Sequence, residues 1–115
     1  MPRNLESIRR ELAVLARRKK ARVVTWSPEM PSDWRPYQVM NPSSGIVFTA
    51  EGAWHFIAEL LENGHHIEEV VLYKPPGKLV YEMHVELGPG LPKLYIKLQL
   101  GSGKVIGRSF HYSTV

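Results

Sequence analysis

The residues best suited to chemistry lie near the C-terminus, in two segments whose pattern predicts a β-hairpin. Leucine and isoleucine alternate with polar side chains along Leu94–Leu100, and a Gly-Ser-Gly loop joins this segment to Lys104–Tyr112. Every second side chain of a strand points to the same face, so the polar side chains are expected opposite the apolar core. The polar face is expected to carry Tyr95, Lys97, Ser109 and His111.

The predicted register of this hairpin follows from its loop. The three-residue loop is expected to pair Leu100 with Lys104, which decides which residues lie directly opposite each other. Opposite residues on neighbouring strands share a face of the sheet. Two polar pairs result, Tyr95 with Ser109 and Lys93 with His111.

Arg108 fits this regular ladder badly. The register directs its side chain to the core face, where burying a guanidinium is costly. A β-bulge at Gly107 would turn Arg108 outward, because glycine within a strand often marks a bulge. The same bulge would change where Ser109 and His111 point, so the sequence leaves their orientation open.

A further strand over 79–87 is expected to add His84 to the polar face, because Tyr81, Met83 and Val85 occupy its core face. Cationic groups bind phosphate and stabilise the charge of a phosphorane-like transition state. A histidine or tyrosine can also move the proton of an RNA 2′-hydroxyl. An ordinary polar solvent face would show the same alternation. The candidate catalytic residues are therefore Lys97, Arg108, His111, His84, Tyr95 and Ser109.

The N-terminal segment is strongly basic. Residues 1–22 carry eight basic and two acidic side chains, although the whole chain has a net charge of +4. Asn4 is a suitable N-cap for a helix that runs to about Lys20. The charge favours an anionic partner, either nucleic acid or an acidic protein, and a solvated helix face is the alternative. The candidate RNA-binding residues are Arg17, Arg18, Lys19, Lys20 and Lys93.

The order of patterns predicts an α+β fold in a single domain spanning 1–115. Thr49 and Gly64 are suited to begin and end a second helix, and a strand, or a short helical turn leading into one, is expected over 67–73. Together with the later strands, these elements predict a core over 47–113. We expect a small antiparallel sheet of three to five strands, with two helices packed on one face.

The proline-rich stretch 27–45 has no periodic pattern. It is interpreted as an ordered loop anchored by Trp34 and Tyr37, and a mobile lid is the alternative. The preceding Arg22–Trp26 is a short strand candidate.

The composition excludes several classes of protein. The chain has no cysteine, and its histidines lack the spacing of zinc ligands, so neither a metal site nor another cofactor is expected. No apolar run approaches the length of about 18–20 residues that crosses a bilayer. No secretory signal is visible at the N-terminus, and a cytoplasmic location is expected.

Two segments, Leu94–Leu100 and Val105–His111, resemble the closing strands of the MqsR/RelE-type mRNA interferase toxins of bacterial toxin–antitoxin systems. In those toxins a strand with a Tyr-hydrophobic-Lys pattern pairs with the final strand. The order of helices and antiparallel strands over 47–113 is also similar to the wider group of metal-independent ribonucleases that includes barnase, RelE and colicin-type tRNases. The N-terminal helix and the proline-rich loop have no counterpart there.

The resemblance implies an mRNA-cleaving toxin whose partner is a cognate antitoxin protein. Tyr95 and Lys97 match the substrate-contacting strand of those toxins. Arg108, Ser109 and His111 lie on the last strand, where related nucleases carry transition-state stabilisers and acid–base groups.

The leading hypothesis is therefore an endoribonuclease that acts by 2′-hydroxyl attack and leaves a 2′,3′-cyclic phosphate. His111 and His84 would serve as base and acid, in either order. Lys97 and Arg108 would stabilise charge, and Tyr95 would stack on a base or relay a proton.

Two alternatives remain open at this point. A non-catalytic module would bind RNA or a protein through its basic N-terminal helix. In the second alternative, the apolar stripe Leu5/Ile8/Leu12/Leu15 would be the contact surface of a homodimer or of a bound antitoxin. Packing of such a stripe onto its own domain is the commoner outcome.

Overall fold

The computed structural model describes residues 4–24, 33–72 and 77–113. Within these ranges a mixed sheet of six strands carries two α-helices and two short 3₁₀ segments. The elements in chain order are α1 (Leu5–Arg17), η1 (Lys19–Ala21), β1 (Arg22–Val23), β2 (Asp33–Trp34), η2 (Pro36–Gln38), α2 (Ala50–Glu62), β3 (Glu68–Val71), β4 (Leu79–Val85), β5 (Leu94–Leu100) and β6 (Val105–Tyr112). None of the helices in the described part of the chain is long and apolar enough to span a membrane.

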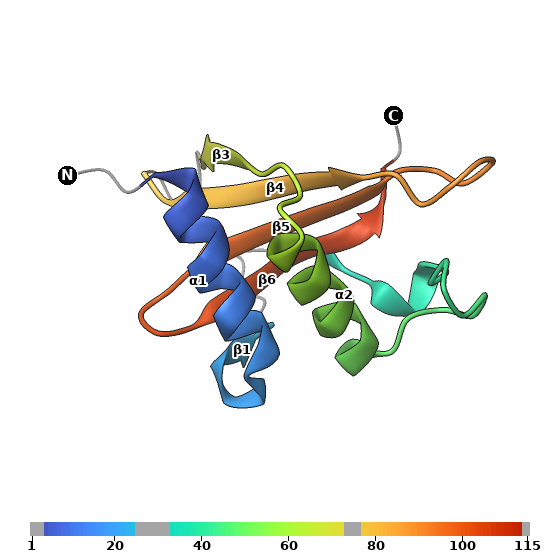
Figure 1. The fold of residues 1–115 in the computed structure, drawn as a ribbon, viewed down its shortest axis with the longest axis horizontal. Coiled ribbons are helices and arrows are strands. Elements are labelled where there is room, and N and C mark those ends of the chain that lie inside the picture. Colours follow the sequence, from blue (N-terminus) through green and yellow to red (C-terminus); the bar gives the residue numbers. More distant parts are fainter. Residues whose placement is uncertain (1–3, 25–32, 73–76, 114–115) are drawn as a thin grey trace.

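The sheet is larger than the sequence predicted, and it is not purely antiparallel. Strands β3 to β6 form an antiparallel meander, and the order across the sheet is β1-β6-β5-β4-β3 (Figure 1). Both β1 and β2 pair with β6 in the parallel direction. Each of these two strands has only two residues, which is too short for an alternation to be visible in the sequence.

Both helices begin at the predicted caps. The Asn4 side chain accepts a hydrogen bond from the Ser7 backbone at 2.8 Å, and the Thr49 hydroxyl accepts one from Gly52 at 2.9 Å. Gly64 follows α2 with a φ of 80°, which suits a residue without a Cβ. The chain leaves α1 at Arg18, and the predicted last turn to Lys20 belongs to η1 instead.

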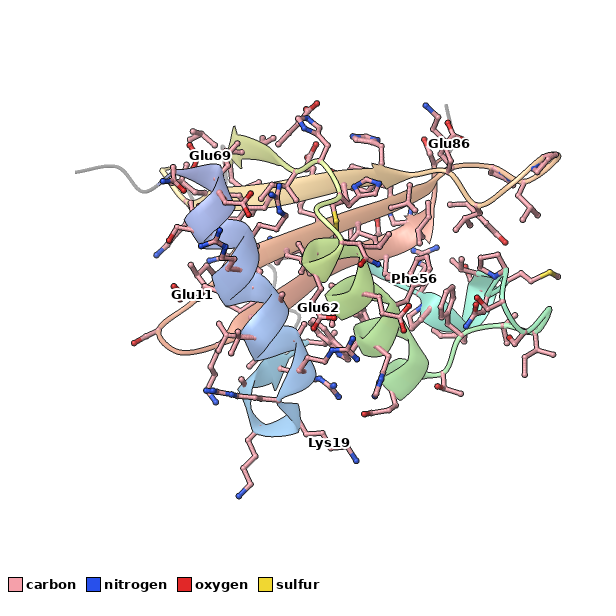
Figure 2. All side chains as sticks on the ribbon, in the orientation of Figure 1. Glu11, Lys19, Phe56, Glu62, Glu69 and Glu86 are labelled. Atoms are coloured by element: carbon pink, nitrogen blue, oxygen red, sulfur yellow. The ribbon has the colours of Figure 1, made fainter. Side chains whose placement is uncertain are left out.

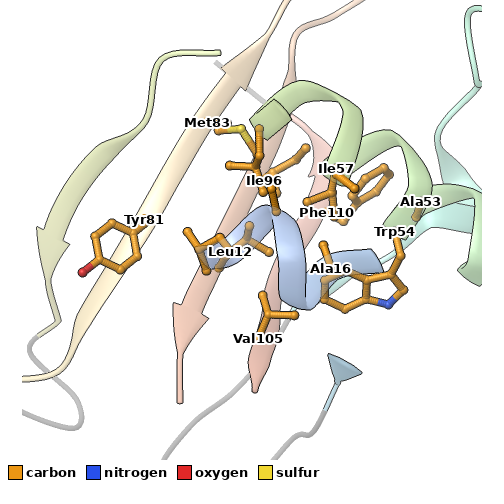
Figure 3. Close-up of a cluster of buried hydrophobic side chains, with 14 of the residues drawn as sticks. Leu12, Ala16, Ala53, Trp54, Ile57, Tyr81, Met83, Ile96, Val105 and Phe110 are labelled. Atoms are coloured by element: carbon orange, nitrogen blue, oxygen red, sulfur yellow. The ribbon is translucent and has the colours of Figure 1, made fainter. Parts of the chain in front are cut away.

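The helices cover one face of the sheet, and their apolar stripes form the core with it (Figures 1 and 3). Leu12 from α1 and Ile57 from α2 are fully buried, as are Ile96 and Phe110 from the central strands. Burial of each such side chain contributes about 1.5–3 kcal/mol. The apolar stripe of α1 is thus used mainly within this core, although Leu5 stays partly exposed.

Trp34 attaches the proline-rich segment to the core. Its ring lies 4.9 Å from Trp54 and 5.5 Å from Phe110, measured between ring centroids. Tyr37 was expected to share this role, but it is 62% exposed. The expected loop also contains a strand, because Trp34 and its neighbour Asp33 join the edge of β6.

The hairpin of β5 and β6 contains the predicted bulge. Leu98 pairs with Gly107, but Lys97 pairs with Ser109, so Arg108 is the additional residue on β6. The Arg108 side chain donates a hydrogen bond to Gln99 Oε1 at 3.3 Å, on the side of the sheet away from the helices. Arg108 is thus turned from the core, as the bulge hypothesis required.

The predicted register is wrong by one residue at the loop and by two beyond the bulge. Leu100 pairs with Val105 rather than with Lys104. As a result Tyr95 lies opposite His111, and Lys93 lies at the level of Ser113, whose backbone N–H donates to its carbonyl at 2.8 Å.

Gly107 is required by the close approach of Trp34. A Cβ added at this position would lie 2.6 Å from Trp34 Cζ3, far inside van der Waals contact. We predict that Gly107→Ala lowers the free energy of unfolding by about 1–3 kcal/mol, because a rigid indole packed against the core must move. Chemical denaturation followed by tryptophan fluorescence measures this change.

Gly101→Ala is the matched control, since its added Cβ would meet Ile106 Cδ1 at 3.4 Å, an ordinary contact. Equal stability of the two variants would show that the indole does not constrain this strand.

Candidate functional site

The sheet face opposite the helices brings polar side chains of β4, β5 and β6 into two rows. One row consists of Glu82, Lys97 and Ser109, which lie directly opposite one another. The other consists of His84, Tyr95 and His111. Residues directly opposite each other in neighbouring strands interact, so these six form one cluster. We call this set the sheet-face cluster.

Tyr95 lies at the centre of the sheet-face cluster. Its ring centroid is 5.3 Å from that of His84 and 5.4 Å from that of His111. Its hydroxyl donates a short hydrogen bond of 2.5 Å to Glu82 Oε2. Partial burial, followed by the hydrogen bond to Glu82 and the charge of that carboxylate, raises the pKa of Tyr95 well above its usual range. The phenol therefore stays protonated at neutral pH and acts as a donor.

The Glu82 carboxylate connects the two rows. Besides Tyr95, it lies 4.0 Å from Lys97 Nζ and 3.8 Å from His84 Nε2. Lys97 Nζ also lies 5.6 Å from the centroid of the Tyr95 ring, within cation–π range. Each cation of the cluster is thus held near a carboxylate or a π face.

Glu82 was not among the predicted site residues. The alternation that placed His84 on the polar face also places Glu82 there, two residues earlier on the same strand. Glu86, the next carboxylate on the same side of the strand, is exposed beyond the end of β4. The alternation of side chains along β4 is the sequence signal that identifies Glu82 as a member of the polar face.

His111 is held in one tautomer by its own strand. Its Nδ1 lies 2.8 Å from the Tyr112 carbonyl oxygen, which only accepts, so Nδ1–H donates. In the neutral ring Nε2 therefore carries the free lone pair. That atom lies 4.0 Å from Asp33 Oδ2 on β2.

Two predicted catalytic residues differ from the others in exposure. Ser109 shares the face but is buried, and Arg108 is only 5% exposed within the bulge. Loss of solvation on burial lowers the pKa of Arg108. Neither side chain is presented to a large ligand in the way that the half-exposed His84 is.

The predicted RNA-binding residues do not form one surface. Lys93 lies 3.4 Å from Glu86, at the end of β4, whereas Lys19 lies at the distant end of α1 (Figure 2). Lys20 neighbours Lys104, whose Nζ donates to the Lys20 carbonyl at 3.1 Å. This basic end of the molecule is separate from the sheet-face cluster, because α1 packs on the opposite face of the sheet.

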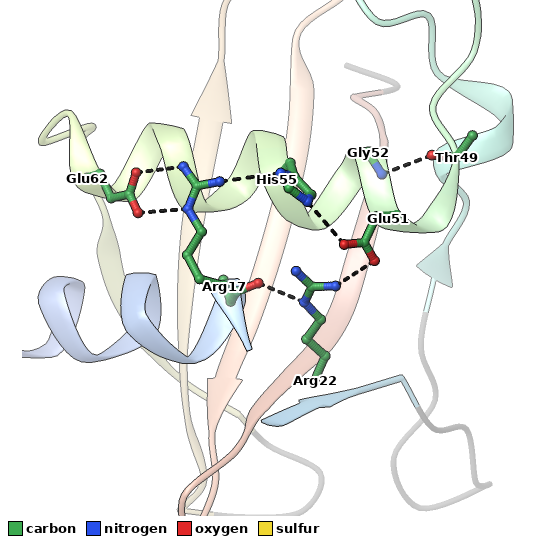
Figure 4. Close-up of polar contacts among 8 residues, drawn as sticks. Arg17, Arg22, Thr49, Glu51, Gly52, His55 and Glu62 are labelled. Carbon is green, nitrogen blue, oxygen red and sulfur yellow. Dashed lines mark hydrogen bonds and ion pairs between the residues drawn. The ribbon is translucent and has the colours of Figure 1, made fainter. Parts of the chain in front are cut away.

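Arg17 is engaged between the two helices (Figure 4). Its Nε and Nη2 donate to the two oxygens of Glu62 at 2.8 and 2.7 Å, a bidentate pair that joins α1 to α2. Arg22 similarly donates to Glu51 at 2.8 Å and to the Ala16 carbonyl at 2.7 Å. Part of the N-terminal charge therefore serves helix packing.

Comparison of the chain with protein-family models, with curated proteins and with solved structures gives no match. In the described ranges no group of three or more His, Cys, Asp or Glu side chains is arranged to hold a metal ion.

The hydrogen bond between Tyr95 and Glu82 should be visible in a titration of the tyrosine hydroxyls. We expect one of the five tyrosines to stay protonated beyond the normal range in an absorbance titration of tyrosinate, and to titrate at lower pH in Glu82→Gln. Removing the carboxylate charge lowers the pKa of Tyr95 only in part, because burial persists. The raised folded-state pKa also means that this group's contribution to stability is complete below pH about 10 and is lost as the pH rises through the folded pKa.

Tyr95→Phe should abolish the late-titrating signal and identify it. Glu86→Gln removes an exposed carboxylate from the end of the same strand and should leave the signal unchanged. An unaltered titration in Glu82→Gln would contradict the assigned hydrogen bond.

Proposed function

We propose that this protein is a metal-independent endoribonuclease that cleaves RNA by attack of the 2′-hydroxyl on the adjacent phosphodiester. The observation that carries the proposal is the row His84, Tyr95 and His111, with Lys97 beside it in the next row. These groups supply an acid, a base, an aromatic platform and a cation within one sheet face.

The spacing of the two imidazoles suits an in-line displacement. Neighbouring strands lie about 4.8 Å apart, so His84 and His111 stand two strand spacings apart on either side of Tyr95. A phosphodiester bound beside the Tyr95 ring, between the two flanking strands, would have one imidazole on each side. This is what the reaction requires, because the attacking and leaving oxygens lie on opposite sides of the phosphorus.

The roles of the two histidines follow from their surroundings. His111 Nε2 has the free lone pair of a fixed tautomer and is the base that takes the 2′-hydroxyl proton. His84 then protonates the 5′-oxygen that leaves. Lys97 stabilises the negative charge that develops on the phosphoryl oxygens. The Tyr95 hydroxyl is already bonded to Glu82, so its ring is the part that stacks on an unpaired base.

The resemblance of β5 and β6 to the closing strands of MqsR/RelE-type toxins supports a more specific proposal, in which this nuclease is an mRNA interferase held inactive by an antitoxin. If the protein is such a toxin, its expression should arrest cell growth, and His111→Ala should relieve the arrest.

The nuclease itself makes a direct prediction. Purified protein should cleave single-stranded RNA in EDTA and leave 2′,3′-cyclic phosphate ends. His84→Ala and His111→Ala should each reduce the rate at least about 100-fold, because a positioned acid or base contributes that much. His66→Ala is the matched control, since this exposed imidazole lies outside the cluster.

A substrate with sulfur in place of the leaving 5′-oxygen separates the two roles, because a thiolate leaves without being protonated. It should restore cleavage by His84→Ala but not by His111→Ala. Intact RNA with all proteins in EDTA would refute the nuclease, and rescue of His111→Ala instead would reverse the assignment.

A non-catalytic RNA-binding module is the second candidate, and the basic end of α1 favours it. Arg18, Lys19 and Lys20 are exposed, and no ion pair among the described residues engages them. Deleting residues 1–22 cannot test this idea, because Leu12 and Ala16 belong to the core.

Replacing Arg18, Lys19 and Lys20 together with serine tests the module without disturbing the core. If these side chains contact phosphates, the slope of log affinity against log salt should decrease by roughly one for each lost contact. The nuclease proposal predicts that the triple variant retains cleavage within about tenfold at saturating RNA, because these residues contribute binding rather than proton transfer. Loss of all RNA binding, with the sheet-face variants silent, would favour the module.

A further inference from the structure

A hollow of about 360 Å³ lies beside His111 and is lined by Asp33, Arg35, Gln38, His111 and Tyr112. It adjoins the sheet-face cluster because β2 pairs with β6, which sets Asp33 opposite Ser109. The Arg35 backbone N–H continues this pairing with a hydrogen bond of 2.9 Å to the Phe110 carbonyl. Space for about a dozen waters also admits a purine base.

Two of the polar side chains that line the hollow, one acidic and one basic, are in contact. Arg35 Nη2 lies 3.0 Å from Asp33 Oδ1, and each side chain is 52% exposed. A carboxylate has about four acceptor positions and a guanidinium has five N–H donors, so this contact and the 4.0 Å approach of His111 to Asp33 leave most of both groups available. The pair therefore offers two acceptors and several donors side by side.

Tyr112 lies where the hollow meets the core, because it pairs with the buried Leu94 and packs on the helix side of the sheet. Its hydroxyl accepts a hydrogen bond of 2.9 Å from the Met40 backbone, which holds the ring in place. Proteins read unpaired RNA bases by hydrogen bonds to their edges, and the polar side chains of the hollow can supply such bonds.

We propose that this hollow binds a guanine base of RNA, on the 5′ side of the phosphodiester that is cleaved. The inference rests on the nuclease proposal. Guanine alone among the four bases has two adjacent donors on its Watson–Crick edge, N1–H and the N2 amino group, and both can bond to the two oxygens of Asp33. Arg35 donates to the O6 acceptor beside them, a pairing that proteins use often for guanine.

The other bases leave this ion pair unsatisfied. Adenine and cytosine present one amino group next to a ring acceptor, and uracil presents one N–H between two carbonyls. Each of these three bases would place an acceptor atom against an oxygen of the Asp33 carboxylate, and two acceptors cannot form a hydrogen bond. The side of cleavage follows from His111, because the 2′-hydroxyl that it deprotonates belongs to the nucleotide whose base lies next to it.

Substrates with a single ribonucleotide in an otherwise deoxyribonucleotide chain test the inference, since each has one cleavable bond. The chain with riboguanosine should be cleaved at least about tenfold faster than chains with adenosine, cytidine or uridine. Asp33→Asn should remove most of this preference, and Arg35→Gln should weaken it. Glu59→Gln, an exposed carboxylate on α2, is the matched control and should retain it.

The ratio between substrates is the readout, because Asp33 also lies 4.0 Å from His111 and its loss changes every rate. Equal cleavage of the four chains, or a guanosine preference that survives Asp33→Asn, would overturn the guanine site and leave the nuclease intact. If no chain is cleaved, the nuclease proposal fails. The affinities of the protein for 3′-GMP and 3′-AMP then decide whether the hollow is a guanine site. Tighter binding of 3′-GMP that depends on Asp33 supports the site, and equal binding overturns it.

Discussion

The contact between Trp34 and Gly107 determines how the last strand presents its side chains. The Trp34 indole lies where any Cβ on Gly107 would be, so the β6 backbone at Gly107 passes directly against the ring. Immediately afterwards the strand carries its additional residue, Arg108, and resumes pairing with Ser109 opposite Lys97. If Arg108 instead paired regularly with Lys97, the register would turn His111 to the core and expose Phe110. The tryptophan, the bulge and the sheet-face cluster are thus parts of one arrangement.

The two faces of the sheet have different tasks. The face beneath the helices buries an apolar core, and ion pairs such as Arg17 with Glu62 fix the helices above it. The opposite face keeps imidazole, phenol, ammonium and carboxylate groups within contact of one another. A rigid sheet suits such a cluster, because groups on strands are held in place more tightly than groups on loops.

The sequence was informative where local rules apply. Helix caps at Asn4 and Thr49, the alternation along β4 and β5, and the bulge at Gly107 all follow from nearby residues. Features that depend on distant contacts were not predictable. The parallel pairing of β2 with β6, which brings Asp33 beside His111, joins segments about 75 residues apart, and a two-residue strand has no periodic signal.

The proposed nuclease requires RNA to contact the sheet face rather than the basic end of α1. An NMR titration with a 2′-O-methylated single-stranded RNA, which lacks the attacking hydroxyl, tests this directly through the imidazole signals of the five histidines. RNA bound at the sheet face should give saturable shifts of His84 and His111, with the signals of the other histidines unchanged. Shifts confined to the backbone of η1, with His84 and His111 silent, would contradict it.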